Sequence, residues 1–189
     1  FTFGWTNTFR YKNFDLSVFI NGSYGNKVYN YLSMKLTHMN SPWTNQLNAV
    51  NGRAQLVPIN PNKVYEDGTM WYNDVSNVMV ANPGASIPRA TINDPNDNDR
   101  ISDRYIEDGS YIRLKNISLG YTFPKKTIDK LGLSNLRIYA NIQNLLTITG
   151  YDGYDPEIGA STSSVNVYGL DNGRYPSPTV YSFGLNVSF

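Results

Sequence analysis

The feature that constrains this chain most is the alternation of apolar and polar side chains on both sides of a short turn, within residues 112–150. Apolar residues occupy every second position after Asn116, and they do so again beyond the turn. These positions are Ile117, Leu119, Tyr121 and Phe123 in the first run and Leu136, Ile138, Ala140 and Ile142 in the second. A period of two is that of a β-strand with one apolar and one polar face. The stretch therefore predicts two antiparallel strands joined at 124–134, where Pro124 stops strand pairing and Gly132 ends a helical turn.

The same alternation occurs at both ends of the sequence. Residues 1–11 and 14–23 form a predicted hairpin around a tight turn at Lys12 and Asn13, and an asparagine in such a turn tolerates a positive φ. Residues 179–189 alternate in the same way and end in an aromatic side chain. Together with the central pair, five strands are predicted, over about 1–11, 14–23, 110–123, 135–148 and 179–189.

Two long segments separate these strands, over about 24–109 and 149–178. Both are rich in Asn, Asp, Gly and Pro, and the first also carries apolar residues at helical spacing that predict a short helix near 27–39. Long and short connections alternate along the chain, so all long loops are expected at one end of the sheet. Short turns at one end and long loops at the other are typical of an outer-membrane β-barrel.

Composition narrows the classes of function. The formal net charge of +1 gives no electrostatic reason to expect a nucleic-acid partner. The chain has no cysteine, which excludes disulfides, thiolate metal sites and cysteine nucleophiles. No apolar run approaches the ~20 residues of a membrane-spanning helix. The 15 tyrosines suit either the aromatic girdles of a membrane barrel or a sugar-binding surface.

The predicted strands are too few to close a barrel of this kind, because the smallest have about eight. An open sheet edge in lipid leaves unpaired backbone groups, which cost several kcal/mol each. We therefore expect the chain, which begins in strand-like sequence, to be part of a larger barrel whose apolar strand faces contact lipid. The alternative is a soluble carbohydrate-binding β-sandwich, in which the face that carries Phe1, Phe3 and Trp5 packs against a second sheet.

A resemblance to a known family favours the barrel. Residues 86–126, SIPRATINDPNDNDRISDRYIEDGSYIRLKNISLGYTFPKK, closely resemble the C-terminal part of SusC/RagA-type TonB-dependent outer-membrane transporters of Bacteroidota. The resemblance continues through LRIYANIQNLLTITGYDGYDPEIG at 136–159 and DNGRYPSPTVYSFGLNVSF at 171–189. The hairpin and its continuation, WTNTFRYKNFDLSVFINGSYGNKVYN at 5–30, also fit, so the resemblance covers essentially the whole chain.

This resemblance implies an all-β fold, an antiparallel transmembrane β-barrel of about 22 strands. The chain would supply the last five strands and long extracellular loops, and the N-terminal plug domain would be absent. The resemblance also implies a multi-pass protein of the outer membrane that imports oligosaccharides or peptides, is not an enzyme and needs no cofactor. A SusD-like surface lipoprotein would cover the loops as a lid, and we call it the lid protein. The TonB complex would act through the missing N-terminal part. Two such transporter–lipoprotein pairs would associate as a dimer.

Residues 150–159 combine aromatic rings with carboxylates, which suits a sugar ligand. Rings stack on the C–H face of a sugar, and carboxylates accept hydrogen bonds from its hydroxyl groups. We predict substrate or lid contact for Tyr151, Asp152, Tyr154 and Asp155. Two alternatives remain open. Pro156 and the neighbouring glycines favour a rigid loop with a structural role, and Asp155 with Glu157 resembles the carboxylate pair of a glycosidase.

Aromatic residues elsewhere are further candidates. Trp71 and Tyr72 lie in the first long loop and are predicted to contact substrate or the lid protein, although a loop aromatic more often anchors its own loop. The final residue, Phe189, is predicted to be a signal for barrel assembly, as the resemblance implies. The same residue would also suit the membrane interface as an aromatic on the last strand.

An acidic cluster near the end of the first long loop offers the oxygen ligands that calcium prefers. Its members are Asp94, Asp97, Asp99, Asp103, Glu107 and Asp108. The spacing fails the EF-hand register, because Asp99 stands where glycine is required and Tyr105 where glutamate is required. Arg100 and Arg104 interleave with the acids, so we predict loop salt bridges and no metal site. His38, the only histidine, is expected on the polar side of the short helix.

Overall fold

The computed structural model describes residues 1–158, 160–161 and 164–189 of the chain. The described residues form two compact units. The first, which we call the sheet unit, comprises Phe1–Asn30 and Ile106–Phe189, and the second, the loop unit, comprises Tyr31–Tyr105. Among the described residues no helix is both long and apolar enough to cross a membrane.

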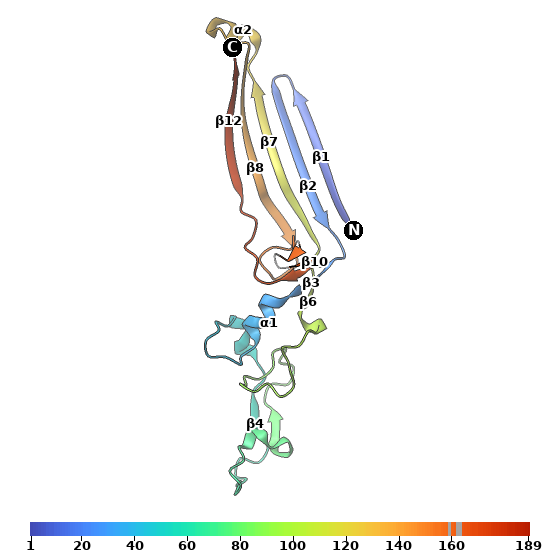
Figure 1. Cartoon of the computed structure of the whole chain (residues 1–189), viewed down its shortest axis with the longest axis vertical. Coiled ribbons are helices and arrows are strands. Elements are labelled where there is room, and N and C mark those ends of the chain that lie inside the picture. The colour runs from blue at the N-terminus through green and yellow to red at the C-terminus, as the bar shows by residue number, and fades with distance from the viewer. Residues whose placement is uncertain (159, 162–163) are drawn as a thin grey trace. The chain divides into compact units, whose positions relative to one another are not determined.

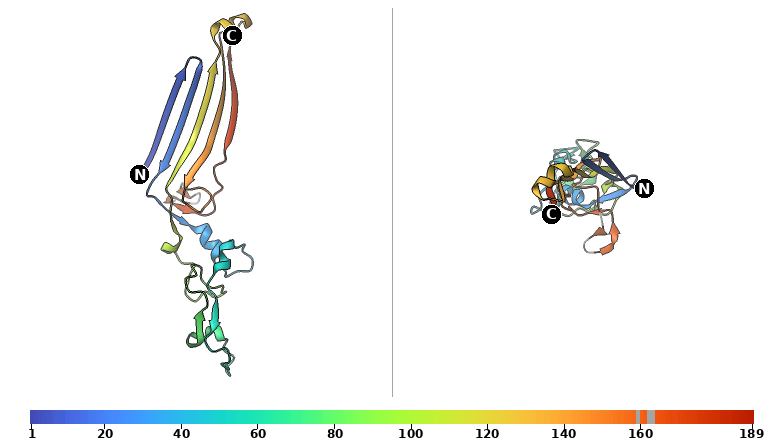
Figure 2. Two further views of the ribbon diagram at one scale, coloured as in Figure 1. Left: turned by 180° about the vertical axis from the view of Figure 1, so that it is seen from behind. Right: turned by 90° about the horizontal axis from the view of Figure 1, so that it is seen from above.

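Five long strands form the main sheet of the sheet unit. They are β1 (Thr2–Tyr11), β2 (Phe14–Ser23), β7 (Tyr111–Thr122), β8 (Asn135–Thr149) and β12 (Val180–Ser188). The order across the sheet is β1-β2-β7-β8-β12, and every neighbouring pair is antiparallel. Figure 1 shows the strands side by side in this order, and Figure 2 shows them from behind. The antiparallel sheet that the alternation predicts is confirmed, and within the described residues it is open and does not close into a barrel.

The register places the apolar side chains of all five strands on one face. One row of direct cross-strand partners consists of Phe9, Leu16, Leu119, Ala140 and Phe183. The adjacent row consists of Thr8, Ser17, Ser118, Asn141 and Ser182. Successive residues of a strand point to opposite faces, so these two rows lie on opposite sides of the sheet. We call the side of the first row the apolar face and the side of the second the polar face.

The apolar face is uncovered. Phe183 is 83% exposed and Trp5 is 59% exposed, and even Ile138 on an inner strand is 45% exposed. A soluble β-sandwich would bury these side chains against a second sheet. The sandwich alternative is therefore wrong for the part of the chain that the structure describes.

An irregularity in the sheet changes the phase of the alternation. The register of β7 shifts between Leu114 and Asn116 against both of its neighbours, which leaves Lys115 without a direct partner in the register. Asn144 on β8 takes a positive φ of 52° beside it. An extra residue of this kind is a β-bulge, and it reverses the facing of the residues beyond it. Leu114 therefore shares the apolar face with Ile117, although three positions separate them.

The hairpin turn between β1 and β2 differs in detail from the prediction. The positive φ, 52°, falls on Lys12 and not on Asn13. Asn13 instead donates a side-chain hydrogen bond to the carbonyl of Thr122 at 2.6 Å. Asn13 therefore joins the hairpin turn to the end of β7.

The connection between β7 and β8 contains the helical turn predicted for it. α2 (Lys125–Ile128) continues into a single 3-10 turn, η5 (Asp129–Leu131), and buries Ile128 to 2% exposure. Gly132 ends the turn in the left-handed region at φ 69°, which glycine adopts without strain. Ser134 then donates its amide to the carbonyl of Ser188 at 2.8 Å, which ties this connection to the end of β12.

A smaller sheet lies at the other end of the sheet unit (Figure 1). β3 (Lys27–Asn30) pairs antiparallel with β6 (Ile106–Asp108) and parallel with β11 (Leu170–Asp171). Val28 in β3 is 1% exposed and forms its core. The helix expected near 27–39 is therefore shorter, because its first residues pair as a strand. A separate antiparallel pair is formed by β9 (Ala160–Ser161) and β10 (Ser164–Tyr168).

The loop unit contains short elements only. They are α1 (Tyr31–Thr37), η1 (Asn48–Gly52), β4 (Leu56–Pro58), η2 (Trp71–Asn73), η3 (Val75–Asn77), β5 (Val78–Val80) and η4 (Asp103–Tyr105). β4 and β5 pair antiparallel, and an isolated parallel bridge joins Arg53 to Ile87. The apolar core is small and includes Met34, Ile87 and Tyr105, each at most 8% exposed.

Candidate functional site

Arg113 organises the polar face of the main sheet beside the second long loop. It lies in β7 and is 3% exposed. Its Nη1 donates to Glu157 Oε2 at 2.7 Å, its Nε donates to Thr147 Oγ1 at 2.8 Å, and its Nη2 donates to Asp155 Oδ1. Lys115, the bulged residue, donates to the same Glu157 oxygen at 2.7 Å. Charge-assisted hydrogen bonds around a buried guanidinium hold the loop that carries both carboxylates against the sheet.

Asp155 is held as an anion within this network. It is 5% exposed and accepts hydrogen bonds from the amides of Ser177 at 3.0 Å and Glu157 at 2.9 Å. Burial alone would raise the pKa of Asp155, but these amides and the Arg113 guanidinium outweigh burial and hold the pKa below its usual range. A glycosidase acid needs a raised pKa, so Asp155 does not fit the general-acid role in that alternative.

Tyr151 anchors the start of the same loop. It is 6% exposed, and its hydroxyl donates to Asp171 Oδ2 at 2.6 Å. Asp171, 1% exposed, also accepts the amides of Gly173 at 2.9 Å and Arg174 at 3.2 Å. Burial, and then the hydrogen bond to Asp171, raise the pKa of Tyr151. The phenol is therefore a neutral donor that joins the two halves of the second long loop.

The remaining two candidates in this loop face solvent. Tyr154 is 64% exposed, and Asp152 is also exposed while its amide donates to Glu107 Oε2 at 3.2 Å. The structure therefore separates the four predicted contact residues into a buried pair, Tyr151 and Asp155, and an exposed pair, Asp152 and Tyr154. Only the exposed pair offers side-chain surface to a ligand in this structure, and the role in substrate or lid contact stays a prediction.

Trp71 and Tyr72 border a groove of about 710 Å³ in the loop unit. Their rings meet edge to face, with 5.7 Å between centroids and an interplanar angle of 80°. Trp71 is half-buried and Tyr72 is 43% exposed. Such an aromatic pair has a fixed geometry and an open ring surface at the same time. Their contact with substrate or lid also stays a prediction.

Two arginines in the same groove were missed by the sequence reasoning. Arg53 and Arg89 both line it, from segments that are brought together by the Arg53–Ile87 bridge and by the hydrogen bond from Ala54 N to Ile87 O at 2.8 Å. No motif connects these positions with Trp71 in the sequence, because the three segments are far apart and share no periodicity. The groove is a product of the loop's tertiary structure.

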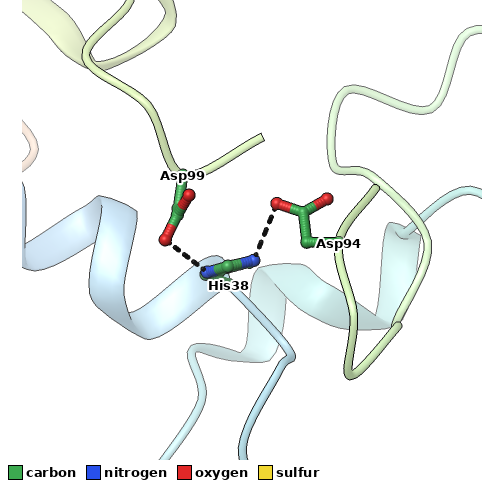
Figure 3. A group of neighbouring side chains, drawn as sticks. All are labelled: His38, Asp94 and Asp99. Atoms are coloured by element: carbon green, nitrogen blue, oxygen red, sulfur yellow. Dashed lines mark ion pairs between the residues drawn. The ribbon is translucent and has the colours of Figure 1, made fainter. Parts of the chain in front are cut away.

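His38 lies between two carboxylates of the loop unit (Figure 3). Its Nε2 is 3.2 Å from Asp94 Oδ2 and its Nδ1 is 3.5 Å from Asp99 Oδ2, and its side chain is only 12% exposed. His38 was expected on the polar side of the short helix, and it instead follows the last residue of α1, where the loop that carries both acids covers the ring. Each ring nitrogen therefore faces a different carboxylate. One metal ion would bind one of these nitrogens only.

Asp94 and Asp108, two members of the acidic cluster, also accept hydrogen bonds from neighbouring residues. Asp94 accepts from the amide and from the side chain of Asn98, each at 2.5 Å. Burial alone would raise the pKa of Asp94, but these two hydrogen bonds and then the nearby His38 lower it. In the sheet unit, Asp108 Oδ2 lies 3.7 Å from Lys27 Nζ, and Asp108 Oδ1 accepts a hydrogen bond from the Ser110 amide at 2.8 Å. The turn caps expected of the acids are present, but among the described residues neither Arg100 nor Arg104 forms an ion pair with them, and Arg104 Nη2 instead donates to the Ser86 carbonyl.

Phe189 is 92% exposed at the end of the fifth strand. Its carbonyl accepts a hydrogen bond from Ser134 Oγ at 3.2 Å, which fixes the backbone and leaves the ring free. Its role as an assembly signal stays a prediction.

Comparisons with known proteins place the chain among large receptors. It is 35% identical over 194 aligned residues to the TonB-dependent receptor P3 of Formosa agariphila, an alignment that covers 100% of this chain and 16% of that receptor. It is 29% identical over 189 residues to the TonB-dependent receptor SusC of Bacteroides thetaiotaomicron, covering 98% of this chain and 15% of that receptor. The chain thus spans only about 16% of the curated relatives it matches. No family model matches it.

Solved structures show the same fold. The RagAB peptide importer in its open-open state aligns with 100% of this chain at a TM-score of 0.64 and 18% identity, and the match covers 17% of the importer chain. A further RagAB peptide transporter structure aligns with 94% of this chain at a TM-score of 0.61 and 19% identity. At this level of identity the likeness shows the architecture alone.

Proposed function

Because this chain is a segment of the SusC/RagA type of TonB-dependent receptor, covering about 16% of the full receptors, we propose that it forms part of the wall and mouth of an outer-membrane nutrient importer. Proteins of this family are transporters and not enzymes. In this proposal the segment supplies the last five strands of the barrel and two extracellular loops, and the plug comes from elsewhere in the receptor.

The observation that carries the proposal is the uncovered apolar face. Five antiparallel strands of 9 to 15 residues carry rows of Phe, Leu, Ile and Val on the apolar face. These lengths match or exceed the ~9–11 residues with which a tilted strand crosses a bilayer. The polar face carries Ser, Thr and Asn, and the Asp15–Arg137 ion pair, which suits a water-filled interior.

The free edges of the sheet support the same conclusion. β1 and β12 each pair on one side only within the described residues. Unpaired backbone groups in lipid cost several kcal/mol each, so both edges require neighbouring strands in a membrane. We propose that the rest of the receptor provides these strands and closes the barrel.

The partners follow from the relatives as proposals. The RagAB structures are of a peptide importer, and SusC is a TonB-dependent receptor of the same type. We propose that a SusD-like surface lipoprotein covers the loops, that TonB drives import through the plug, and that two transporter–lipoprotein pairs associate. The cargo is an oligosaccharide or a peptide.

Uptake by intact cells tests this function. A strain that lacks the receptor gene is complemented with the complete receptor, or with a receptor from which residues 31–105 are removed, and uptake of labelled oligosaccharides and peptides is measured. The proposal expects uptake that requires the complete receptor and stops when TonB is absent. Equal uptake with and without the receptor would contradict it. Co-purification of a surface lipoprotein with the receptor tests the partner separately.

A further inference from the structure

The groove in the loop unit is positively charged. Its lining includes Arg53 and Arg89, and none of the described residues that line it is acidic. A volume of about 710 Å³ falls within the ~300–1,000 Å³ of ordinary ligand sites. A groove of this size with two guanidinium groups and no carboxylate favours an anionic ligand.

The charge of the two arginines is not neutralised by the protein. Neither arginine forms an ion pair with a carboxylate of the described residues. Arg53 is oriented by a long hydrogen bond from Nη1 to the Val50 carbonyl, at 3.3 Å, which leaves most of its donors unused. Arginine presents five N–H donors in a planar fork that matches carboxylate or sulfate oxygens.

Two acidic residues adjoin the lining residues in the sequence, and both contact partners outside the groove. Asp74 follows the aromatic segment and binds Lys63 Nζ at 2.5 Å and the Tyr65 hydroxyl at 2.9 Å. Asp94 precedes the lining residue Pro95 and faces His38 and Asn98. The positive charge of the groove therefore persists although the loop unit contains many acidic residues.

The rest of the lining offers groups that recognise a sugar. Trp71 and Tyr72 provide ring surface on which the C–H face of a pyranose can stack. Gln55, Asn73 and Asn93 add three side-chain amides, each of which both donates and accepts hydrogen bonds, as sugar hydroxyls do. Apolar side chains such as Leu56, Ile92 and Pro95 also line the groove, so the preference for a sugar rests on the paired rings and the three amides.

We propose that this groove binds an anionic oligosaccharide, one that carries carboxylate or sulfate groups, with Arg53 and Arg89 holding the anionic groups and Trp71 and Tyr72 holding the rings. The inference rests on the proposed import function, because it assigns the class of cargo to a site on that importer. It adds two binding residues and excludes neutral glycans as the preferred cargo.

Binding to the complete receptor, purified with its lipoprotein partner in detergent, tests the assignment. The probes are tetragalacturonate, its methyl ester as a neutral match, a sulfated heparin tetrasaccharide and tetraglutamate as an acidic peptide. We expect at least one anionic sugar to bind at least tenfold more tightly than the methyl ester, with an affinity that falls as salt is raised. Arg53→Gln and Arg89→Gln are each expected to weaken that binding by about tenfold or more, since hydrogen bonds to charged groups contribute about 1.5–3 kcal/mol. Arg100→Gln, an exposed arginine outside the groove, is the matched control and is expected to change nothing.

The possible results distinguish a failure of anionic-sugar binding in the groove from a failure of the proposed import function. Equal binding of the anionic sugars and the methyl ester, or anionic binding that neither substitution weakens, would overturn the inference. Tighter, arginine-dependent binding of tetraglutamate would overturn the assignment to sugars. If a variant does not fold, the salt dependence and probe preference of the unmodified receptor decide. Uptake of neutral glycans or peptides in cells would leave the import function standing in each of these cases, whereas no receptor-dependent uptake of any cargo would remove that function as well.

Discussion

Arg137 on β8 reaches over Gly120 of β7 to Asp15 on β2, so that its Nη2 lies 2.6 Å from Asp15 Oδ2. The ion pair joins strands that are not neighbours, and it lies on the polar face. The intervening residue is Gly120, and a Cβ there would lie too close to both the guanidinium and the carboxylate, so any larger residue would displace the ion pair. This contact shows most directly that one side of the sheet is built for charge while the other side carries aromatic and aliphatic rows.

Gly120→Val should therefore disrupt the sheet from its polar side. Overpacking of a well-packed position costs about 1–3 kcal/mol, and here the loss of the Asp15–Arg137 contact adds to it. We expect a clear fall in the amount of folded receptor in the outer membrane, measured from the heat-modifiable band on gels. Gly150→Val is the control, because a Cβ there meets open space. Equal levels for the two variants would mean that the close approach at position 120 has no importance.

Arg113→Met should release the second long loop from the sheet. Removal of one partner from a buried ion pair costs about 3–5 kcal/mol, because Asp155 is left as an uncompensated buried charge. We expect faster amide hydrogen exchange in residues 151–158 of the intact receptor. Adding Asp155→Asn to the same variant should restore part of the protection. Arg100→Met, at an exposed position, should leave exchange in this loop unchanged, and protection in Arg113→Met equal to that control would contradict the role of the network.

The stability of the loop unit should depend on Asp94 at acid pH. The pKa of Asp94 is lowered in the folded state, so its contribution is complete above the ordinary value of 3.8 and is lost as the pH falls through the lower folded value. The melting temperature of the intact receptor should exceed that of Asp94→Asn at pH 5, and this difference should shrink as the pH approaches 3. A difference that stays constant from pH 5 to pH 3 would show that the ionised carboxylate contributes nothing.

Phe189→Ala should reduce assembly without changing the transport that each assembled receptor performs. The ring is 92% exposed and makes no packing contribution in this structure, so a loss of folded receptor would point to recognition during assembly. Several-fold less receptor in the outer membrane is the expected result. Phe183→Ala removes another exposed aromatic, from β12 itself, and serves as the control. A similar fall for both variants would identify a lipid contact and not a terminal signal.

The sheet was predictable from the sequence because alternation is a local property that each strand carries in its own residues. Leu119 and Ala140 fall on one face by counting alone, and the structure pairs them directly. The bulge at Lys115 leaves a trace in the sequence, since the apolar residues change phase between Leu114 and Ile117. The helix near 27–39 was predicted too long because the strand pairing of Val28 with Glu107, 79 positions away, overrides its helical spacing.

The loop sites were only partly predictable. The composition of residues 150–159 marks them as unusual, but nothing in their spacing says that Asp155 turns inward to Arg113, 42 positions earlier. Arg53 and Arg89 carry no motif at all, and only the tertiary structure of the loop unit brings them to one groove with Trp71. Contacts of this kind depend on long-range packing, which a local pattern does not encode.

The central claim is that the apolar face meets lipid and the polar face meets water, and the accessibility of single cysteines tests it most directly. This segment contains no cysteine, so Ile138→Cys and Leu185→Cys on one face and Ser118→Cys and Ser182→Cys on the other can each be spin-labelled in a complete receptor whose cysteines outside this segment are replaced. In bilayers, collision with oxygen, which dissolves in lipid, should dominate at 138 and 185. Collision with a water-soluble nickel chelate should dominate at 118 and 182. Labels at 138 and 185 that meet the nickel chelate as readily as those at 118 and 182, or that meet neither reagent, would contradict the account.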